Sequence, residues 1–235
     1  MCMGARRQAD YTAVMPEMTP QRWQYTNDYS REVFGAQDAH LAGLMKQAVA
    51  RGLPDIAVSS DVGRLLTILT SMTRGRLAIE VGTLGGYSGI WIARGLSSGG
   101  KLITIEPVDL HADFAQEQFK LAGVTDRIQL RRGTGLNVLP QLAFELPPQS
   151  VDMVFLDAIK SEYPDYWNIV RPLIAVGGLI IADNVYGSGD WWIDDESNPM
   201  RAGADRFNRM VASDADFQSV AVPLRQGVLI GRRVR

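Results

Sequence analysis

The chain has 235 residues, 46% of them hydrophobic, which suffices for the core of one compact domain and excludes wholesale disorder. Its formal net charge of −2 excludes a general electrostatic attraction to nucleic acid or to an anionic membrane. The single cysteine, Cys2, excludes an internal disulfide, and no apolar run approaches the roughly 20 residues that span a bilayer. The first ten residues lack the apolar stretch of a secretory signal, so we expect a cytoplasmic protein.

Helical patterns fill the first third of the chain, after an expected flexible arm at residues 1–18. Thr19 and Pro20 form a typical helix start, with a hydroxyl cap and a proline at the first helical position, and Gly35 is a typical stop. Apolar residues at helical spacing predict two more helices before any strand. The three predicted helices lie at about 19–34, at 38–51 and from residue 60 onward.

From residue 76, short apolar runs alternate with amphipathic segments, which predicts alternating strands and helices. Such alternation gives right-handed crossovers and a largely parallel sheet that is covered on both faces. The tail differs, because the runs 217–223 and 227–233 follow a helix near 200–212 and lie so close together that they must pair antiparallel. The other expected strands are 77–81, 102–106, 128–131, 151–157 and 178–183, with helices near 87–94, 110–122, 137–144 and 163–175.

These elements predict an α/β fold of the doubly wound, Rossmann-like kind. Its seven-stranded sheet is expected to be mostly parallel, with an antiparallel C-terminal hairpin and extra N-terminal helices. We expect residues 19–235 to form a single domain. Within it, the helices of residues 19–56 are expected to serve substrate binding or dimerisation.

A glycine-rich turn, EVGTLGGYSG, follows the first strand, where open α/β sheets bind nucleotides. Its glycines allow a sharp turn and the close approach of a ligand, but their spacing does not match the dinucleotide pattern G-x-G-x-x-G. Glu106 ends the next strand, where a carboxylate can accept hydrogen bonds from both hydroxyls of a ribose. Alone, the turn is equally compatible with an ordinary strand-to-helix turn, and Glu106 is better explained as a solvated acid at a strand end. Together they favour an adenosine-type ligand.

Oxygen-bearing side chains stand at the ends of two further strands. Asp157 ends the strand VDMVFLD, and Asp183 and Asn184 follow the strand GLIIA. Because adjacent parallel strands lie about 4.8 Å apart, these three side chains are expected in one crevice, where hard oxygen ligands suit Mg²⁺, Mn²⁺ or Ca²⁺. Lys160 beside them is a candidate base. The alternatives are that each acid caps the next turn and that Lys160 only forms a salt bridge.

From about residue 56 to its end, the chain resembles the metal-dependent class I O-methyltransferases, the caffeoyl-CoA and catechol O-methyltransferase family. The resemblance implies S-adenosylmethionine as cofactor, a divalent metal that is Mg²⁺ in the first place with Mn²⁺ or Ca²⁺ as alternatives, and a homodimer. The matching stretches are LAIEVGTLGGYSGIWIA, LITIEP, AGVTDRIQLRRG, VDMVFLDAIKSEYPDYW, GGLIIADNVYGSG and PLRQGVLIGRR.

The resemblance also implies roles for individual residues. Lys160 matches the catalytic base, and Asp157, Asp183 and Asn184 match the metal ligands. The segment GTGLN, which contains Gly135, lacks the family's usual alanine and acidic or amide pattern. The residues expected to hold the cofactor are Val58, Glu80, Gly82, Thr83, Ser88, Glu106, Gly135 and Asp157.

The loop after Asn184 is expected to contact the methyl acceptor through Ser188, Trp191 and Trp192. Packing of the loop onto the body is an equally acceptable role for the tryptophans. Four acidic residues against one arginine make the loop a poor neighbour for a polyanion such as RNA or a coenzyme A tail. The expected acceptor is therefore a small, neutral or cationic, catechol-like molecule.

Three other functions remain as alternatives. Methylation of a hydroxylated tRNA base is supported by the C-terminal Arg232, Arg233 and Arg235 but opposed by the acidic loop. An NAD-dependent dehydrogenase is opposed by the glycine spacing and by the antiparallel tail. A non-catalytic adenosine-binding module is opposed by the intact D-x-x-K and DN pattern.

Overall fold

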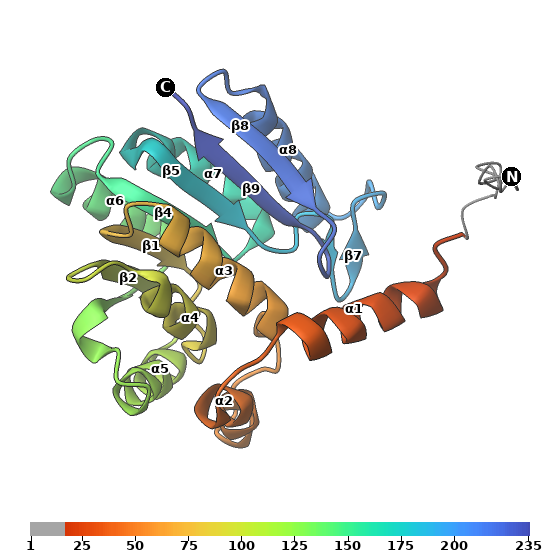
Figure 1. Ribbon diagram of the computed structural model, residues 1–235. Coiled ribbons are helices and arrows are strands. Elements are labelled where there is room, and N and C mark those ends of the chain that lie inside the picture. The colour runs from red at the N-terminus through yellow and green to blue at the C-terminus, as the bar shows by residue number, and fades with distance from the viewer. Residues whose placement is uncertain (1–16) are drawn as a thin grey trace, which may run out of the picture.

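The computed structural model describes residues 17–235, so the expectation of a flexible arm at 1–18 and the position of Cys2 fall outside it, apart from residues 17 and 18. Within the described part, one sheet of seven strands has the order β3-β2-β1-β4-β5-β9-β8 (Figure 1). The strands are β1 (Leu77–Val81), β2 (Lys101–Glu106), β3 (Ile128–Arg132), β4 (Val151–Leu156), β5 (Ile174–Ala182), β8 (Phe217–Val222) and β9 (Val228–Arg233).

The pairing of the strands confirms the predicted fold class. Strands β1 to β5 are parallel to one another, and β9 lies antiparallel between β5 and β8. The helices are α1 (Pro20–Phe34), α2 (Ala39–Ala50), α3 (Ser60–Met72), α4 (Tyr87–Gly95), α5 (Asp109–Leu121), α6 (Gly135–Glu145), α7 (Tyr163–Val170) and α8 (Pro199–Ser213).

Helices cover both faces of the sheet because alternate residues of the central strands point to opposite sides. Ala78 and Met153 belong to the hydrophobic cluster beneath α2, α3, α4 and α5. Ile79 and Val154 belong to a second cluster, beneath α6, α7 and α8. Every residue of β4 is buried, as expected for a central strand covered on both faces. None of the helices within residues 17–235 combines the length and apolar character needed to cross a bilayer.

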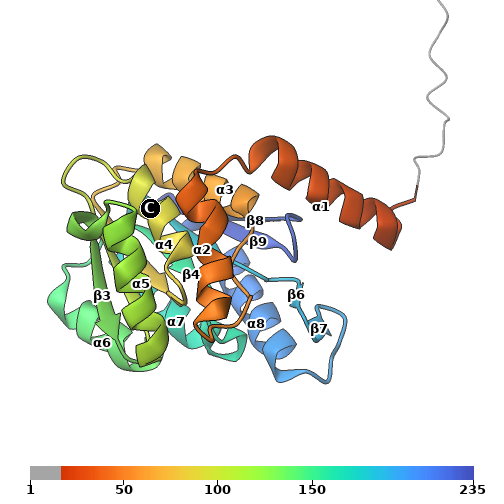
Figure 2. The ribbon, with the colours of Figure 1, turned by 90° about the horizontal axis from the view of Figure 1, so that it is seen from below.

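The N-terminal helices begin where the sequence predicts. The side chain of Thr19 caps α1 and that of Asp38 caps α2, each by accepting a backbone N–H. Helices α2 and α3 pack onto the body, whereas α1 extends away from it and buries none of its residues (Figure 2). Within the described part of the chain, the large apolar side chains Tyr25, Tyr29, Val33 and Phe34 of α1 are therefore exposed.

The structure differs from the sequence-based expectation in two places. Helix α7 ends at Val170 rather than near residue 175, because Pro172 cannot continue the helical hydrogen bonds, and the apolar residues from Ile174 onward already belong to β5. The loop after Asn184 contains a short antiparallel ribbon that the sequence did not indicate. It consists of β6 (Gly187–Ser188) and β7 (Trp191–Trp192).

Candidate active site

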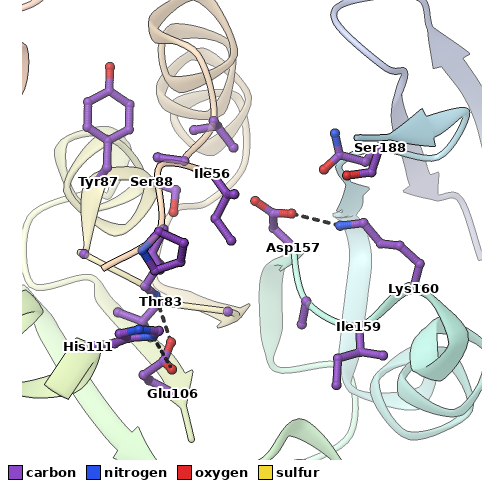
Figure 3. Close-up of a pocket in the computed structure, with 18 of the residues that line it drawn as sticks. Ile56, Thr83, Tyr87, Ser88, Glu106, His111, Asp157, Ile159, Lys160 and Ser188 are labelled. Atoms are coloured by element: carbon purple, nitrogen blue, oxygen red, sulfur yellow. Dashed lines mark hydrogen bonds and ion pairs between the residues drawn. The ribbon is translucent and has the colours of Figure 1, made fainter. Parts of the chain in front are cut away.

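A cavity of about 440 Å³ opens at the carboxyl ends of β1 and β4, where the strand order reverses (Figure 3). Crevices at such reversal points are the usual ligand sites of open α/β sheets. The turn after β1 forms one wall and the segment after β4 forms the other. Among the residues with a predicted role, those that line the cavity are Val58, Gly82, Thr83, Ser88, Glu106, Asp157, Lys160, Asn184, Ser188 and Trp191.

The glycine-rich turn is shaped by the neighbouring strand. Gly82 has a φ of 103°, and a Cβ at this position would collide with the carbonyl oxygen of Asp157. Gly86 has a φ of 82°, and a Cβ there would meet the ring of Phe119. Only glycine adopts these conformations without strain. The turn can therefore lie close to the end of β4, and it brings Thr83 and Ser88 to the cavity wall.

Glu80 lies beneath the cavity rather than on its wall. Its side chain is fully buried and accepts hydrogen bonds from the hydroxyls of Ser88 and Thr104, each at 2.6 Å. Burial raises the pKa of Glu80 to about 7, although both hydroxyls oppose the shift. Glu80 therefore reaches the cavity only through the residues that it bonds, of which Ser88 is itself a lining residue.

Glu106 faces the cavity from the end of β2, on the side opposite Asp157 (Figure 3). Its Oε2 accepts the backbone N–H of Leu84 at 2.8 Å, and its Oε1 accepts that of Val108 at 3.0 Å. The ring Nδ1 of His111 lies 3.2 Å from the same Oε1. These contacts fix the orientation of the carboxylate. They do not use all of its lone pairs, so it can still accept hydrogen bonds from a ligand.

Lys160 is buried at the other wall of the cavity. Its Nζ lies 2.9 Å from Asp157 Oδ1 and donates to the hydroxyl of Tyr163 at 2.8 Å. Burial by itself would lower the pKa of Lys160, but the negative charges of Asp157 and Asp183 outweigh it, so the pKa lies above its ordinary value. In this arrangement Lys160 is an ammonium. The salt bridge considered as an alternative role is thus present.

The loop of Lys160 is held by the helix behind it. Gly203 of α8 lies against the backbone of Lys160 and Ser161, and a Cβ at Gly203 would collide with it. The hydroxyl of Tyr163 donates to the carbonyl oxygen of Leu156 at 2.9 Å. Lys160 is therefore positioned by packing as well as by its ion pair.

Asp183 and Asn184 follow β5, one strand away from Asp157. The carboxylate of Asp183 is buried, and its Oδ1 has no hydrogen-bond partner within residues 17–235. Burial and the charge of Asp157 raise the pKa of Asp183. Its Oδ2 lies 3.2 Å from Nη1 of Arg225, and the amide of Asn184 donates to Oε1 of Gln226 at 3.4 Å.

The three expected metal ligands thus come from the ends of adjacent strands. Within residues 17–235, no group of three or more histidine, cysteine, aspartate or glutamate side chains is gathered as for a metal site. The expected set contains only two such side chains, Asp157 and Asp183, because its third member is the amide of Asn184. Asn184 has a left-handed φ of 56°, a conformation that asparagine tolerates better than most residues.

The remaining predicted residues separate into two groups. Ser188 and the buried Trp191 line the cavity, whereas Trp192 is 43% exposed and does not. Gly135, at the start of α6, is also absent from the lining. A Cβ at Gly135 would lie 2.6 Å from the ring of Tyr166, so its lack of a side chain serves the packing of α6 on α7.

Several cavity residues had no predicted role. His111 carried a usable signal, because it lies five residues after Glu106 in the first turn of a helix. Tyr87, whose hydroxyl donates to Gln37 at 2.6 Å, stands beside Ser88 in the glycine-rich turn and could have been included with it. Met200 of α8 carried no signal, because a segment far away in sequence brings it to the cavity. The same holds for Arg225, which contacts Asp183 from the turn between β8 and β9.

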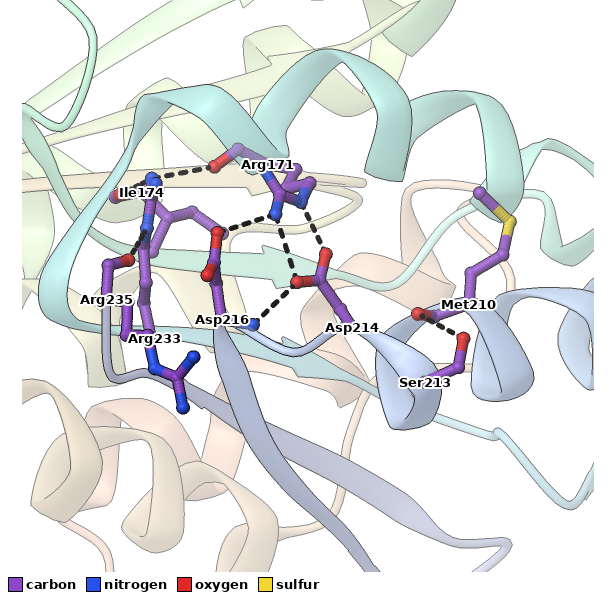
Figure 4. A network of polar contacts seen from close by, with 8 residues as sticks. All are labelled: Arg171, Ile174, Met210, Ser213, Asp214, Asp216, Arg233 and Arg235. Atoms are coloured by element: carbon purple, nitrogen blue, oxygen red, sulfur yellow. Dashed lines mark hydrogen bonds and ion pairs between the residues drawn. The ribbon is translucent and has the colours of Figure 1, made fainter.

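The C-terminal arginines do not form one basic surface. Arg232 and Arg235 are exposed, but Arg233 is buried and donates to the carbonyl oxygens of Ile174, at 2.7 Å, and Arg235, at 2.6 Å (Figure 4). Beside it, Arg171 forms ion pairs with Asp214 and Asp216. These contacts anchor the C-terminal strands to the segment that begins β5.

Comparisons with known proteins found relatives that match most of the chain. A family model described as O-methyltransferase matches residues 31–234. A catechol O-methyltransferase from Niastella koreensis is 36% identical over 197 residues, which are 84% of this chain and 89% of that protein. An O-methyltransferase from Bacillus cereus, solved in complex with SAH, is 31% identical with a TM-score of 0.80, covering 92% of this chain and 99% of that one. TomG from Streptomyces achromogenes, an O-methyltransferase of tomaymycin synthesis solved with SAM, is 29% identical with a TM-score of 0.79, covering 93% and 100%.

The raised pKa of Glu80 predicts a pH dependence of stability. Between the ordinary carboxyl pKa of 4.5 and about 7, the folded chain holds a proton on Glu80 that the unfolded chain has released. The free energy of unfolding should therefore fall as pH rises through this window. Glu80→Gln should remove up to about 1.4 kcal/mol per pH unit of that slope.

Urea unfolding between pH 5 and pH 8 measures the slope. Glu145→Gln is the matched control, because the Glu145 side chain is at the surface. An unaltered slope in Glu80→Gln would mean that the buried carboxyl is not protonated in the folded protein.

Proposed function

The chain belongs to the O-methyltransferase family and is an S-adenosylmethionine-dependent O-methyltransferase, and from this premise we propose that it methylates a catechol-like small molecule with the help of a divalent cation. The observation that carries the proposal is the set of oxygen donors at the ends of two adjacent strands, with an ammonium beside it. Asp157, Asp183 and Asn184 would hold the cation, and Lys160 would act on the hydroxyl of the acceptor.

The residues present fit a hard divalent cation. Asp183 has a buried carboxylate oxygen without a hydrogen-bond partner in the described chain, and an uncompensated oxygen of this kind is costly unless a ligand satisfies it. Two carboxylates and an amide suit Mg²⁺, with Mn²⁺ or Ca²⁺ as alternatives. When bound, such a cation supplies Lewis-acid activation of a hydroxyl group that lies next to it.

The cofactor is proposed to lie across the cavity, with its ribose at one wall. Glu106 is oriented to accept hydrogen bonds from the ribose hydroxyls. Thr83, Ser88 and the backbone of Val58 would surround the methionyl part, with Glu80 acting from beneath through Ser88. Gly82 keeps this wall close to Asp157, which stands between the cofactor and the acceptor.

Lys160 is proposed to accept the proton of the acceptor hydroxyl at Nζ. In the structure its ion pair with Asp157 keeps it charged, so Nζ must first release a proton to solvent, which requires that the carboxylate of Asp157 is engaged elsewhere. When bound, the cofactor would supply a sulfonium methyl group to the deprotonated oxygen. The C–S bond would break as the C–O bond forms, so the positive sulfonium and the negative oxygen would both become neutral. Catalysis would then depend mainly on alignment of the two reactants and on exclusion of water.

The cavity wall supports a small acceptor without negative charge. Ile56, Ile159 and Trp191 offer apolar surface for an aromatic ring. Among residues 17–235, the only lysine or arginine of the lining is Lys160, which is already paired, whereas Asp190 adds a negative charge on the acceptor side. The part of this wall that residues 17–235 form therefore offers no basic surface to an anionic coenzyme A ester or an RNA strand.

The alternatives from other functional classes are not supported. Membership of the O-methyltransferase family excludes the dehydrogenase and the non-catalytic module as descriptions of this chain. Methylation of a tRNA base is not favoured by the C-terminal arginines, since Arg233, one of the three, is buried. RNA is therefore kept only as a control substrate.

A second copy of the chain is proposed to cover α1. Tyr25, Tyr29 and Phe34 are 72%, 51% and 60% exposed, and a hollow of about 500 Å³ lies between α1 and α3. Burial of these aromatic side chains would stabilise a dimer.

Sedimentation equilibrium tests the proposed dimer. The wild-type protein should be a dimer, and Phe34→Glu should weaken it because the substitution places a charge in the apolar contact. A monomeric wild-type protein would contradict the proposal.

Removal of divalent cations tests the proposed function. With a catechol acceptor, methyl transfer should cease in EDTA and return on addition of excess Mg²⁺, because the hydroxyl is no longer activated without the cation. Calorimetric titration should show that the chain still binds S-adenosylmethionine in EDTA. Full activity in metal-free buffer, or methylation of hydroxyuridine RNA in preference to catechols, would refute the proposal.

Substitution of Lys160 tests the proposed base. Lys160→Ala should lower kcat by about 100-fold or more, the usual contribution of a positioned base, while the Kd of S-adenosylmethionine stays unchanged. Lys120→Ala, at an exposed position of α5, is the matched control and should retain full activity. A wild-type kcat in Lys160→Ala would mean that another group takes the proton.

A further inference from the structure

Each expected metal ligand already has a partner within the chain. Asp157 pairs with Lys160, Asp183 with Arg225, and Asn184 with Gln226. Two of these three partners come from the turn between β8 and β9. We propose that Arg225 is an internal counter-cation of Asp183, which competes with the divalent cation and lowers its affinity. The inference rests on the proposed metal dependence.

The backbone of the turn that carries Arg225 is fixed by hydrogen bonds. The backbone N–H groups of Val185 and Tyr186 donate to the carbonyl oxygens of Gly227, at 3.0 Å, and Gln226, at 2.8 Å. The turn is thereby fixed to the segment that follows Asn184. Arg225 itself has a left-handed φ of 52°, which is unfavourable for a residue with a side chain. This conformation directs the guanidinium to Asp183, 42 residues away in sequence.

The ion pairs make the site electrically neutral without a metal. Asp157 and Asp183 contribute two negative charges, and Lys160 and Arg225 contribute two positive ones. A dication that enters while both cations remain would be repelled by them at short range, in a buried place where screening is weak. High affinity therefore requires that at least one of the two cations gives up its carboxylate.

Of the two cations, Arg225 rather than Lys160 can move away from its carboxylate. Its side chain is 22% exposed and stands on a surface turn, so it can reach solvent by rotation about its own bonds. Lys160 is buried, bonded to Tyr163 and enclosed by α8. Asp183 Oδ2 is therefore the oxygen for which the arginine and the dication compete, whereas Oδ1 is free of any partner in the described chain.

Binding of Mn²⁺ alone to the full-length protein tests the inference. The signal of free Mn²⁺ in electron paramagnetic resonance gives its Kd for wild type and for Arg225→Gln. We expect the variant to bind Mn²⁺ about tenfold more tightly or better, which corresponds to ~1.4 kcal/mol. Without Mn²⁺ its Tm should be lower than that of wild type, because Asp183 loses its counter-charge, and saturating Mn²⁺ should raise its Tm by more.

Two further variants separate the possible results. Arg225→Lys retains the positive charge, so its Kd should lie nearer to wild type than to Arg225→Gln, and it protects the test if the glutamine variant folds poorly. Arg232→Gln makes the same change of net charge at an exposed position of β9 and should leave the Kd unchanged. Equal Mn²⁺ affinity in wild type, Arg225→Gln and Arg232→Gln would overturn the role of Arg225 while the metal site stands. No Mn²⁺ binding by any of them would overturn both this inference and the proposed metal dependence.

Discussion

The site depends on two backbone hydrogen bonds that join the ends of three neighbouring strands. The N–H of Asp157 donates to the carbonyl oxygen of Val81 at 2.9 Å, and the N–H of Asp183 donates to that of Leu156 at 3.0 Å. These bonds continue the parallel pairing of β1, β4 and β5 by one residue beyond the strands. They hold the glycine-rich turn, the first acid and the second acid at the spacing of adjacent strands, which no single loop would enforce.

Several carboxyl groups lie close together in the crevice, where little water can solvate their negative charges. Glu80, Asp157 and Asp183 are near one another and largely withdrawn from water, so each needs a compensating group. Glu80 meets this demand by holding a proton up to about pH 7, whereas Asp157 and Asp183 meet it with Lys160 and Arg225. The proposed dication would replace Arg225 as the positive charge that compensates Asp183. Cation binding, protonation of a carboxyl group and ion pairing are thus three ways of compensating the buried negative charge at this site.

The C-terminal hairpin of β8 and β9 makes polar contacts at both ends of β5. At one end, buried Arg233 bonds the backbone where β5 begins, and Arg171 is paired with acids beside the start of β8. At the other end, the turn that precedes β9 carries Arg225 and Gln226 to the residues that follow β5. Because β9 is antiparallel to β5, anchoring one end of it also sets the position of the turn at the other.

Much of the fold and the main residues of the site could be predicted from the sequence, because they depend on local pattern. Short apolar runs and helical apolar spacing predict nearly every strand and helix. Because parallel strands end at one edge of the sheet, Asp157, Asp183 and Asn184 are expected there together. Only the tertiary structure decided that Gly135 contacts Tyr166, that Glu80 lies below the cavity, and that α1 buries none of its residues. It alone also paired Arg225 with Asp183. The physical reason is that side-chain direction and the register between β5 and β9 follow from packing between segments far apart in sequence, which local pattern does not encode.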